Sequence, residues 1–183
     1  DNSRDLLRRQ AQILGITSRQ LEAVGQPHRE LLAKGLITRA EYLRRLSKAL
    51  GQPLFQSALL KQVFPGIVRR MPAVWRIARV LRKNGYIVGV ITNDFPPHRF
   101  SKRVRLADQF WPTIASHAVH ARKPERKIFS IAVNRAKVSF SESVFFDDKQ
   151  RNVLAARKLG MHAFQYKNPP QLIRELRRYG VRI

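Results

Sequence analysis

Polar side chains whose types suit phosphoryl chemistry occur at three places in the chain. Thr92 ends the run YIVGVIT, Lys123 lies in ARKPERKIF, and Asp147 and Asp148 follow the run VFF. A hydroxyl and an ammonium group bind phosphoryl oxygens, whereas carboxylates hold Mg²⁺, which prefers oxygen ligands. If the fold brings these side chains together, they could hold a phosphate group and a metal ion.

The segments that must position these residues predict an alternating α/β domain. Apolar runs with β-branched or aromatic residues indicate buried parallel strands, and apolar residues at helical spacing indicate helices between them. In such domains ligands bind at the carboxyl ends of the strands, where Thr92 and Asp147 would lie. The expected elements are strands over 86–92, 143–146 and 162–166, and helices over 72–83, 152–159 and 172–179.

The first third of the chain reads as a compact helical unit. Thr17 with Gln20, and Thr38 with Glu41, have the spacing of a capping box, in which each side chain bonds a backbone N–H at a helix start. The sequence therefore predicts two parts, a small helical unit over 1–64 and an α/β core with a Rossmann-like parallel sheet over 65–183.

At these motifs the sequence resembles the haloacid dehalogenase (HAD) superfamily, in the branch that carries a small helical cap. The phrase GLITRAEYLRRLSKALG matches the cap region, and three polar motifs occur in the family's order. The resemblance implies a HAD-like core and Mg²⁺ as cofactor if the site is functional. It assigns phosphate binding to Thr92 and Asn93, charge neutralisation to Lys123, metal binding to Asp147 and Asp148, and a supporting role to Asn152.

One motif of the family has no counterpart in these 183 residues. The family begins with an apolar strand that ends in Asp-x-Asp, whose first aspartate is the nucleophile. Asp1 and Asp5 follow no strand and lie in an arginine-rich helical start. Without a nucleophile, phosphoryl transfer lacks its covalent acceptor. Because the missing strand would be central, we expect the two strands beside it either to pair directly or to enclose a strand from another segment or another chain.

The net charge points to a polyanionic partner. The chain has 36 Lys and Arg against 12 Asp and Glu, which gives +24, and it has no cysteine. Arginine suits bidentate contacts with phosphate, so we expect RNA binding, whereas the tryptophans Trp75 and Trp111 are expected to be packing anchors. The expected RNA-binding residues are Arg76, Arg79, Arg82, Lys83, Arg99, Lys102, Arg103, Arg105, Arg174, Arg177 and Arg178.

These features support two main hypotheses. The first is a catalytically inactive HAD-like domain, without cofactor, that serves as a basic component of a mitochondrial ribosome or another ribonucleoprotein. Its partners would be RNA and neighbouring proteins, without a membrane and without DNA specificity. The alternative is a Mg²⁺-dependent HAD-type phosphatase or dehalogenase whose nucleophile motif lies upstream of Asp1. A free RNA-binding regulator is a third, weaker reading.

Overall fold

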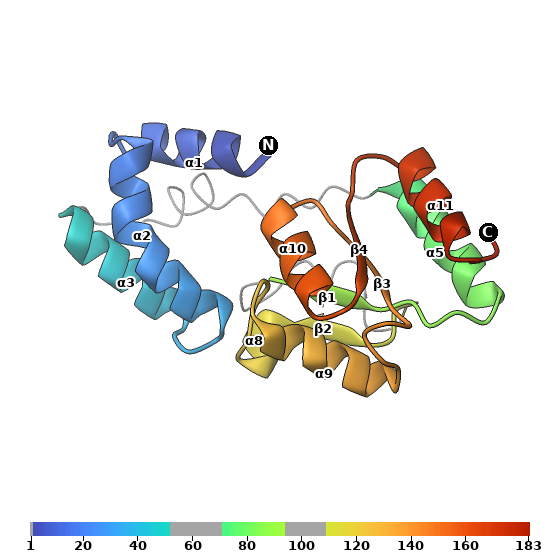
Figure 1. Ribbon diagram of the computed structural model, residues 1–183. Helices are drawn as coiled ribbons and strands as arrows, with labels where there is room; N and C mark the ends of the chain where they lie inside the picture. The colour runs from blue at the N-terminus through green and yellow to red at the C-terminus, as the bar shows by residue number, and fades with distance from the viewer. Residues whose placement is uncertain (1, 52–70, 94–108) are drawn as a thin grey trace.

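The computed structural model describes residues 2–51, 71–93 and 109–183 (Figure 1). Helices of the N-terminal part lie at one end, and an α/β core follows. The helices are α1 (Asn2–Ile13), α2 (Ser18–Ala33), α3 (Arg39–Leu50), α5 (Pro72–Lys83), α8 (Ser116–Val119), α9 (Arg126–Ala136), α10 (Gln150–Lys158) and α11 (Pro169–Arg178). The strands are β1 (Val90–Thr92), β2 (Thr113–Ala115), β3 (Val144–Asp147) and β4 (His162–Gln165).

The strands form two parallel pairs. β1 pairs with β2, with Ile91 opposite Ile114, and β3 pairs with β4, with Phe145 opposite Ala163. No ladder among the described strands joins β1 to β3. Of the two expected arrangements, the described strands therefore do not show direct pairing, and the alternative of a strand enclosed between β1 and β3 stays a prediction. β1 is also shorter than the expected strand over 86–92, and the sequence did not indicate β2.

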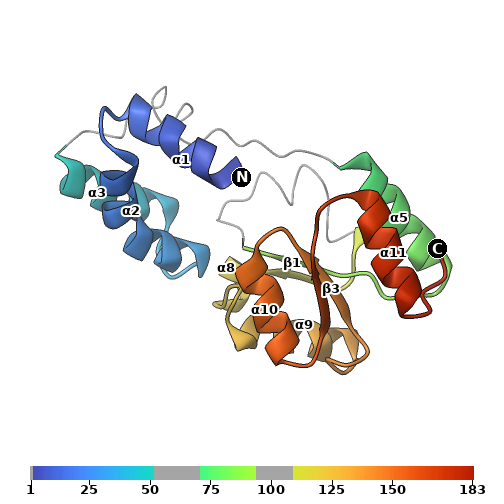
Figure 2. The same ribbon diagram turned by 45° about the horizontal axis from the view of Figure 1, so that its top comes forward.

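Side chains of β3 alternate between two apolar clusters, which gives the core its layers. Phe145 packs in a cluster with Phe129 of α9 and Val153 of α10. Val144 and Phe146 point the other way and join the cluster that α5 and α11 form. Helices thus cover both faces of the parallel strands, as Figures 1 and 2 show. This arrangement confirms the predicted α/β class with a Rossmann-like core.

Helices α5 and α11 lie side by side and bury their apolar faces against each other and against the strands (Figure 2). Ile77 and Leu81 of α5 and Leu172 and Leu176 of α11 are each less than a tenth exposed. Burial of such side chains stabilises the fold by about 1.5 to 3 kcal/mol each. Tyr179 was expected to point inward, but 45% of it is exposed, and its ring packs on that of His162.

The N-terminal helices α1, α2 and α3 share a separate apolar cluster that includes the buried Leu14 and Leu46. The capping box of Thr17 and Gln20 is present with both of its bonds. Thr38 accepts a bond from the N–H of Glu41, but the Glu41 carboxylate pairs with arginines of α3 instead of reaching back. The expected boundary at residue 64 lies outside the described residues. None of the described helices is long and apolar enough to span a membrane.

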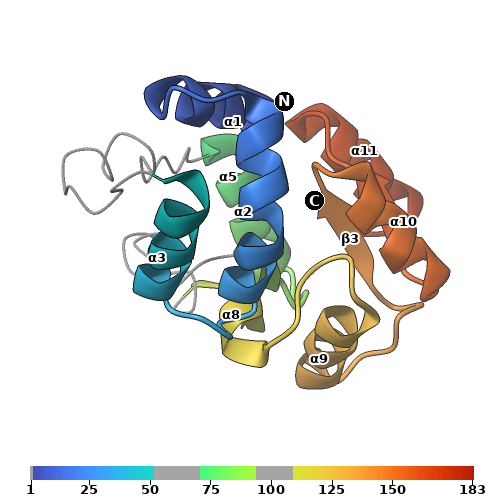
Figure 3. The ribbon, with the colours of Figure 1, turned by 90° about the vertical axis from the view of Figure 1, so that its left-hand side faces the viewer.

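The helical unit contacts the core where α2 ends. Gly35 has a left-handed φ of +66°, and a Cβ atom there would lie 2.6 Å from the carbonyl oxygen of His117 in α8. Nearby, the buried Ser116 hydroxyl donates to the carbonyl of Ala33 at 2.6 Å. Figure 3 shows the end of α2 above α8. Only glycine allows both this conformation and this approach.

Gly35→Ala should therefore destabilise the chain more than Gly51→Ala. Gly51 has nearly the same φ, +63°, but no atom lies within 4 Å of its missing Cβ, so it is a matched control. Left-handed strain costs about 1 to 2 kcal/mol at either position, and the clash with His117 should add about 1 to 3 kcal/mol at Gly35. Denaturant unfolding of both variants measures the difference. Equal losses would show that the close approach does not contribute to stability.

Candidate active site

An ion pair between Lys123 and Asp147 lies between the two strand pairs. The ammonium Nζ of Lys123 donates to Oδ2 of Asp147 at the end of β3, at 2.7 Å, and to the carbonyl oxygen of Ile91 in β1, at 2.6 Å. The side chains of Lys123 and Asp147 are only 12% and 4% exposed. Lys123 is therefore a buried contact between β1 and β3, whereas the neighbouring Arg126 and Lys127 are exposed.

Asn93, just after β1, fixes the backbone of Lys123. Its side-chain Nδ2 donates to the carbonyl of Lys123 and its Oδ1 accepts from the N–H of Lys123, both at 2.8 Å. These two bonds place Lys123, which belongs to the loop between α8 and α9, at the carboxyl end of β1. Thr92, half-buried, ends β1 at the same edge. The structure thus brings Thr92, Asn93 and Lys123 together, as the motif order predicted.

Asp147 is held in its charged form by its neighbours. Its Oδ1 accepts from the backbone N–H of Lys149 at 2.9 Å and from Nδ2 of Asn152 at 2.7 Å. Burial alone would raise the pKa of Asp147, but the charge of Lys123 and the hydrogen bonds from Lys123, Lys149 and Asn152 outweigh it, so that the pKa lies below its ordinary value of 3.8. The carboxylate therefore stays ionised at neutral pH.

The oxygen atoms around Asp147 match the preference of Mg²⁺. Asn152 is buried, and its Oδ1 has no hydrogen-bond partner among the described residues. Asp148, the residue that follows Asp147 in the chain, is exposed. Hard cations with oxygen ligands suit such a donor set and keep several waters. Asp147, Asp148 and Asn152 could hold Mg²⁺, although the described residues contain no group of three or more His, Asp or Glu side chains at a metal site.

The helical unit also braces the loop that carries Lys123. Lys34, after α2, pairs with Glu125 at 2.8 Å, and its carbonyl lies 2.8 Å from Nδ1 of His120. Glu30 of α2 lies 3.6 Å from Arg122, whose side chain is 14% exposed. We did not predict these contacts. The available signal was that Glu30 and Glu125 are two of only 12 acidic residues in the chain.

None of the predicted RNA-binding residues that the structure describes contacts this ion pair. Arg76, Arg79, Arg82 and Lys83 are exposed on α5, and the three arginines of α11 are exposed as well. Arg99, Lys102, Arg103 and Arg105 lie outside the described residues. Trp75 is half-buried against Phe110, as expected of a packing anchor, but Trp111 is 64% exposed, so that expectation was wrong for Trp111.

A family model now identifies the class of protein to which this site belongs. The model of haloacid dehalogenase-like hydrolases matches residues 8–160, most of the chain. The chain belongs to this hydrolase family. The match confirms the resemblance that the motifs of Thr92, Lys123 and Asp147 carried, and it covers the helical unit as well as the core.

Curated relatives of this HAD-like chain include phosphatases. It is 27% identical over 134 residues to the sesquiterpene phosphatase astK of Aspergillus oryzae, covering 72% of this chain and 68% of that protein. It is 26% identical over 163 residues to bifunctional epoxide hydrolase 2 of Rattus norvegicus, covering 80% of this chain and 29% of that protein. It also covers 14% of acyl-CoA dehydrogenase family member 10 of Mus musculus. The chain thus spans less than a third of the last two relatives.

Solved structures agree with the fold. A HAD-like hydrolase from Porphyromonas gingivalis superposes with a TM-score of 0.67 at 23% identity, covering 87% of this chain and 88% of that one. A HAD family enzyme from Bacteroides thetaiotaomicron, solved with magnesium and inorganic phosphate, has a TM-score of 0.61 at 23% identity and covers 75% of this chain and 73% of that one.

The lowered pKa of Asp147 predicts a pH-dependent contribution to stability. Because the folded carboxyl holds its charge to lower pH than the unfolded one, its contribution is complete above about pH 3.8 and is lost as pH falls through the lower folded pKa. Asp147→Asn leaves the buried ammonium of Lys123 without its counter-charge and should therefore lower the free energy of unfolding by about 3 to 5 kcal/mol at pH 7. This difference should shrink below about pH 4.

Urea unfolding at several pH values between about 7 and 3 measures this difference. Asp148→Asn is the control, because a change at an exposed carboxylate should alter stability by less than about 0.5 kcal/mol. A loss for Asp147→Asn that is the same at pH 3 as at pH 7 would contradict the assigned ionisation.

Proposed function

We propose that this chain supplies the phosphate- and metal-binding part of a Mg²⁺-dependent HAD-type phosphohydrolase. The observation that supports the proposal most strongly is the buried ammonium of Lys123, held by Asp147 and by the carbonyl of Ile91. Lysine has three N–H donors, and these two bonds use two of them. The third is available for a phosphoryl oxygen of the substrate.

The side chains at this edge have distinct tasks in the proposed reaction. Lys123 and the hydroxyl of Thr92 bind the phosphoryl oxygens and stabilise the charge that develops on them. Asn93 acts as a positioning residue, because both polar atoms of its amide group hold the backbone of Lys123. When bound by Asp147 and Asp148, Mg²⁺ would supply further positive charge at the phosphoryl group.

The covalent acceptor must come from outside the described residues. No ladder joins β1 to β3, and the carbonyl of Ile91 points away from β2, since the N–H of Val90 and the carbonyl of Val88 make the bonds to the β2 side. A strand between β1 and β3 would end beside Lys123. We place the nucleophilic carboxylate on such a strand, which a segment N-terminal to residue 1 would supply.

The inactive ribonucleoprotein hypothesis receives less support than this one. The family and its relatives include hydrolases and phosphatases by name, and the relatives given above include no ribosomal protein. That hypothesis, with its mitochondrial location and protein partners, rests on the charge of +24. It stays a prediction, and it would be supported if the complete gene product showed no phosphatase activity.

The proposal predicts Mg²⁺-dependent hydrolysis of p-nitrophenyl phosphate by the product of the complete reading frame. Lys123→Met should lower kcat about 10²- to 10³-fold, because one charged donor to the transition state is lost. Lys127→Met, an exposed lysine four residues later, is the matched control and should leave kcat unchanged. Residues 1–183 alone should bind phosphate without turnover. An inactive complete product, or a Lys123→Met variant as active as the wild type, would overturn the proposal.

A further inference from the structure

Apart from the site around Lys123, the core carries a strongly basic surface on α5 and α11, on the side away from the helical unit. Its seven cations are exposed and come from two helices that lie side by side (Figures 1 and 2). We call it the basic surface, and it consists of Arg76, Arg79, Arg82 and Lys83 on α5, and Arg174, Arg177 and Arg178 on α11.

Acidic residues do little to neutralise this surface. α5 has none, and α11 has only Glu175, which is 5% exposed and lies beneath Arg174 and Arg178. Among the described residues, Arg76, Arg79 and Arg177 form no ion pair. In contrast, Arg44 and Arg45 of α3 both pair with Glu41. Two adjacent helices thus present seven cations to solvent with only one, buried, acidic residue between them.

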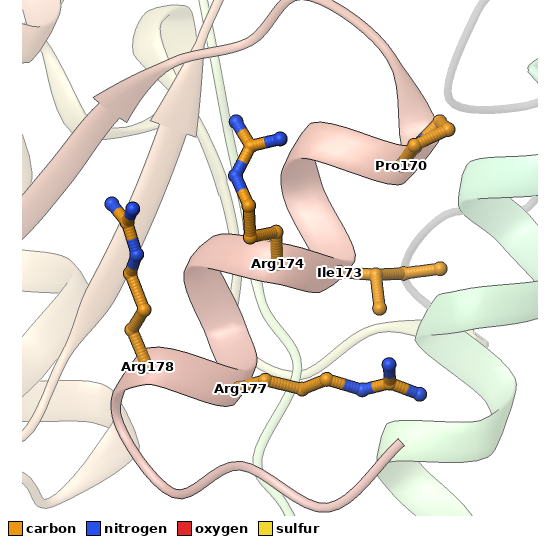
Figure 4. A pocket seen from close by; sticks show the side chains of 5 residues that line it. All are labelled: Pro170, Ile173, Arg174, Arg177 and Arg178. Carbon is orange, nitrogen blue, oxygen red and sulfur yellow. The ribbon is translucent and has the colours of Figure 1, made fainter.

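A hollow on α11 adds shape to this charge. It is lined by Pro170, Ile173 and the three arginines of α11, as Figure 4 shows. Two apolar side chains beside three guanidinium groups suit a ligand that alternates apolar and anionic groups, as a nucleotide chain does. None of the residues that line the hollow contacts Lys123 or Asp147.

The exposed ring of Trp111 belongs to the residue that follows Gln109 and Phe110, which both contact α5. Arg82 donates to the carbonyl of Gln109, and Phe110 packs against Trp75 of α5 with ring centroids 4.9 Å apart. Trp111 comes next in the chain and is 64% exposed. Exposed aromatic rings beside basic grooves are platforms on which the bases of single-stranded nucleic acids stack.

From these observations we propose that the basic surface binds single-stranded RNA, independently of the hydrolase site. Arginine side chains contact the phosphates, and Trp111 stacks on a base. Phosphate contacts carry no sequence information, so we expect little sequence preference. A membrane surface fits less well, because the apolar faces of α5 and α11 are buried against each other and the strands.

The test measures binding of an unstructured RNA of about 20 nucleotides by fluorescence anisotropy, with the full chain at several salt concentrations. The triple variant Arg76→Gln, Arg79→Gln, Arg177→Gln removes three cations that make no ion pair, and it spares Arg82, Arg174 and Arg178, which hold other groups. If each contacts one phosphate, the slope of log affinity against log salt should flatten by about 2, and affinity at about 0.1 M salt should fall roughly 100-fold.

The matched control is Arg8→Gln, Arg9→Gln, Arg19→Gln, which removes the same charge from exposed positions of α1 and α2. It should leave the slope nearly unchanged, and the melting temperatures of both triple variants show that each is folded. Equal effects of the two triple variants, or a slope near zero for the wild type, would overturn the proposal, because either result denies this surface a special role.

Two further arms test the identity of the partner. Trp111→Ala should weaken RNA binding about 10-fold, whereas Trp111→Phe keeps a stacking ring and should restore most of it. Vesicles of phosphatidylcholine with phosphatidylserine serve as the alternative polyanion. Sedimentation with these vesicles that the triple variant abolishes, without salt-sensitive RNA binding, would replace RNA by a membrane and overturn the proposal.

Discussion

The ion pair between Lys123 and Asp147 is the interaction on which the rest of the described site depends. Two parallel strand pairs meet there without a shared ladder, and a single ammonium group bonds the carbonyl of Ile91 on one pair and the carboxylate of Asp147 on the other. Asn93 fixes the backbone of Lys123, and Asn152 fixes the carboxylate of Asp147. The chain therefore builds a charged centre in its interior from groups of four separate segments.

Burying two charges is costly, so this arrangement needs a reason beyond stability. Desolvation of an ion pair often cancels its attraction, while removing one partner alone leaves a buried charge and destabilises a fold by about 3 to 5 kcal/mol. Lys123 and Asp147 offset the cost with several hydrogen bonds, and they hold a positive group ready at the carboxyl end of β1. A preorganised cation of this kind binds an anion without further rearrangement, which is the property that phosphoryl transfer requires.

The sequence predicted the site better than its surroundings. Thr92 and Asp147 were found because each follows an apolar run that predicts a strand, and strand ends meet at one edge. Lys123 was found because its motif resembles one of the family's. The sequence did not predict the short strand β2, because the run TIA is too brief to show the alternation typical of a strand. The ion pairs of Glu30 and Lys34 with the loop of Lys123 were not predicted either, since contacts between distant segments leave no local signal in the sequence. For Trp111 the sequence prediction was wrong. The large ring predicted burial, but burial depends on tertiary packing, and in this structure the ring is exposed.

Two independent features thus coexist on one small core. The proposed hydrolase site contains one buried lysine, whereas the proposed RNA-binding surface consists of exposed cations on the helices α5 and α11, and the two share no residue. The basic surface holds 7 of the 36 Lys and Arg residues, so it accounts for only part of the net charge of +24. Fold alone would not reveal the second feature, because function resides in the particular side chains that a fold presents.

The most direct measurement for the central claim is a crystal structure of the complete gene product with Mg²⁺ and vanadate, which imitates a phosphoryl group. The account predicts vanadate within hydrogen-bonding distance of Lys123 Nζ and the Thr92 hydroxyl. It also predicts a strand between β1 and β3 that ends in a carboxylate facing the vanadium. Direct pairing of β1 with β3, or vanadate bound away from Lys123, would contradict it.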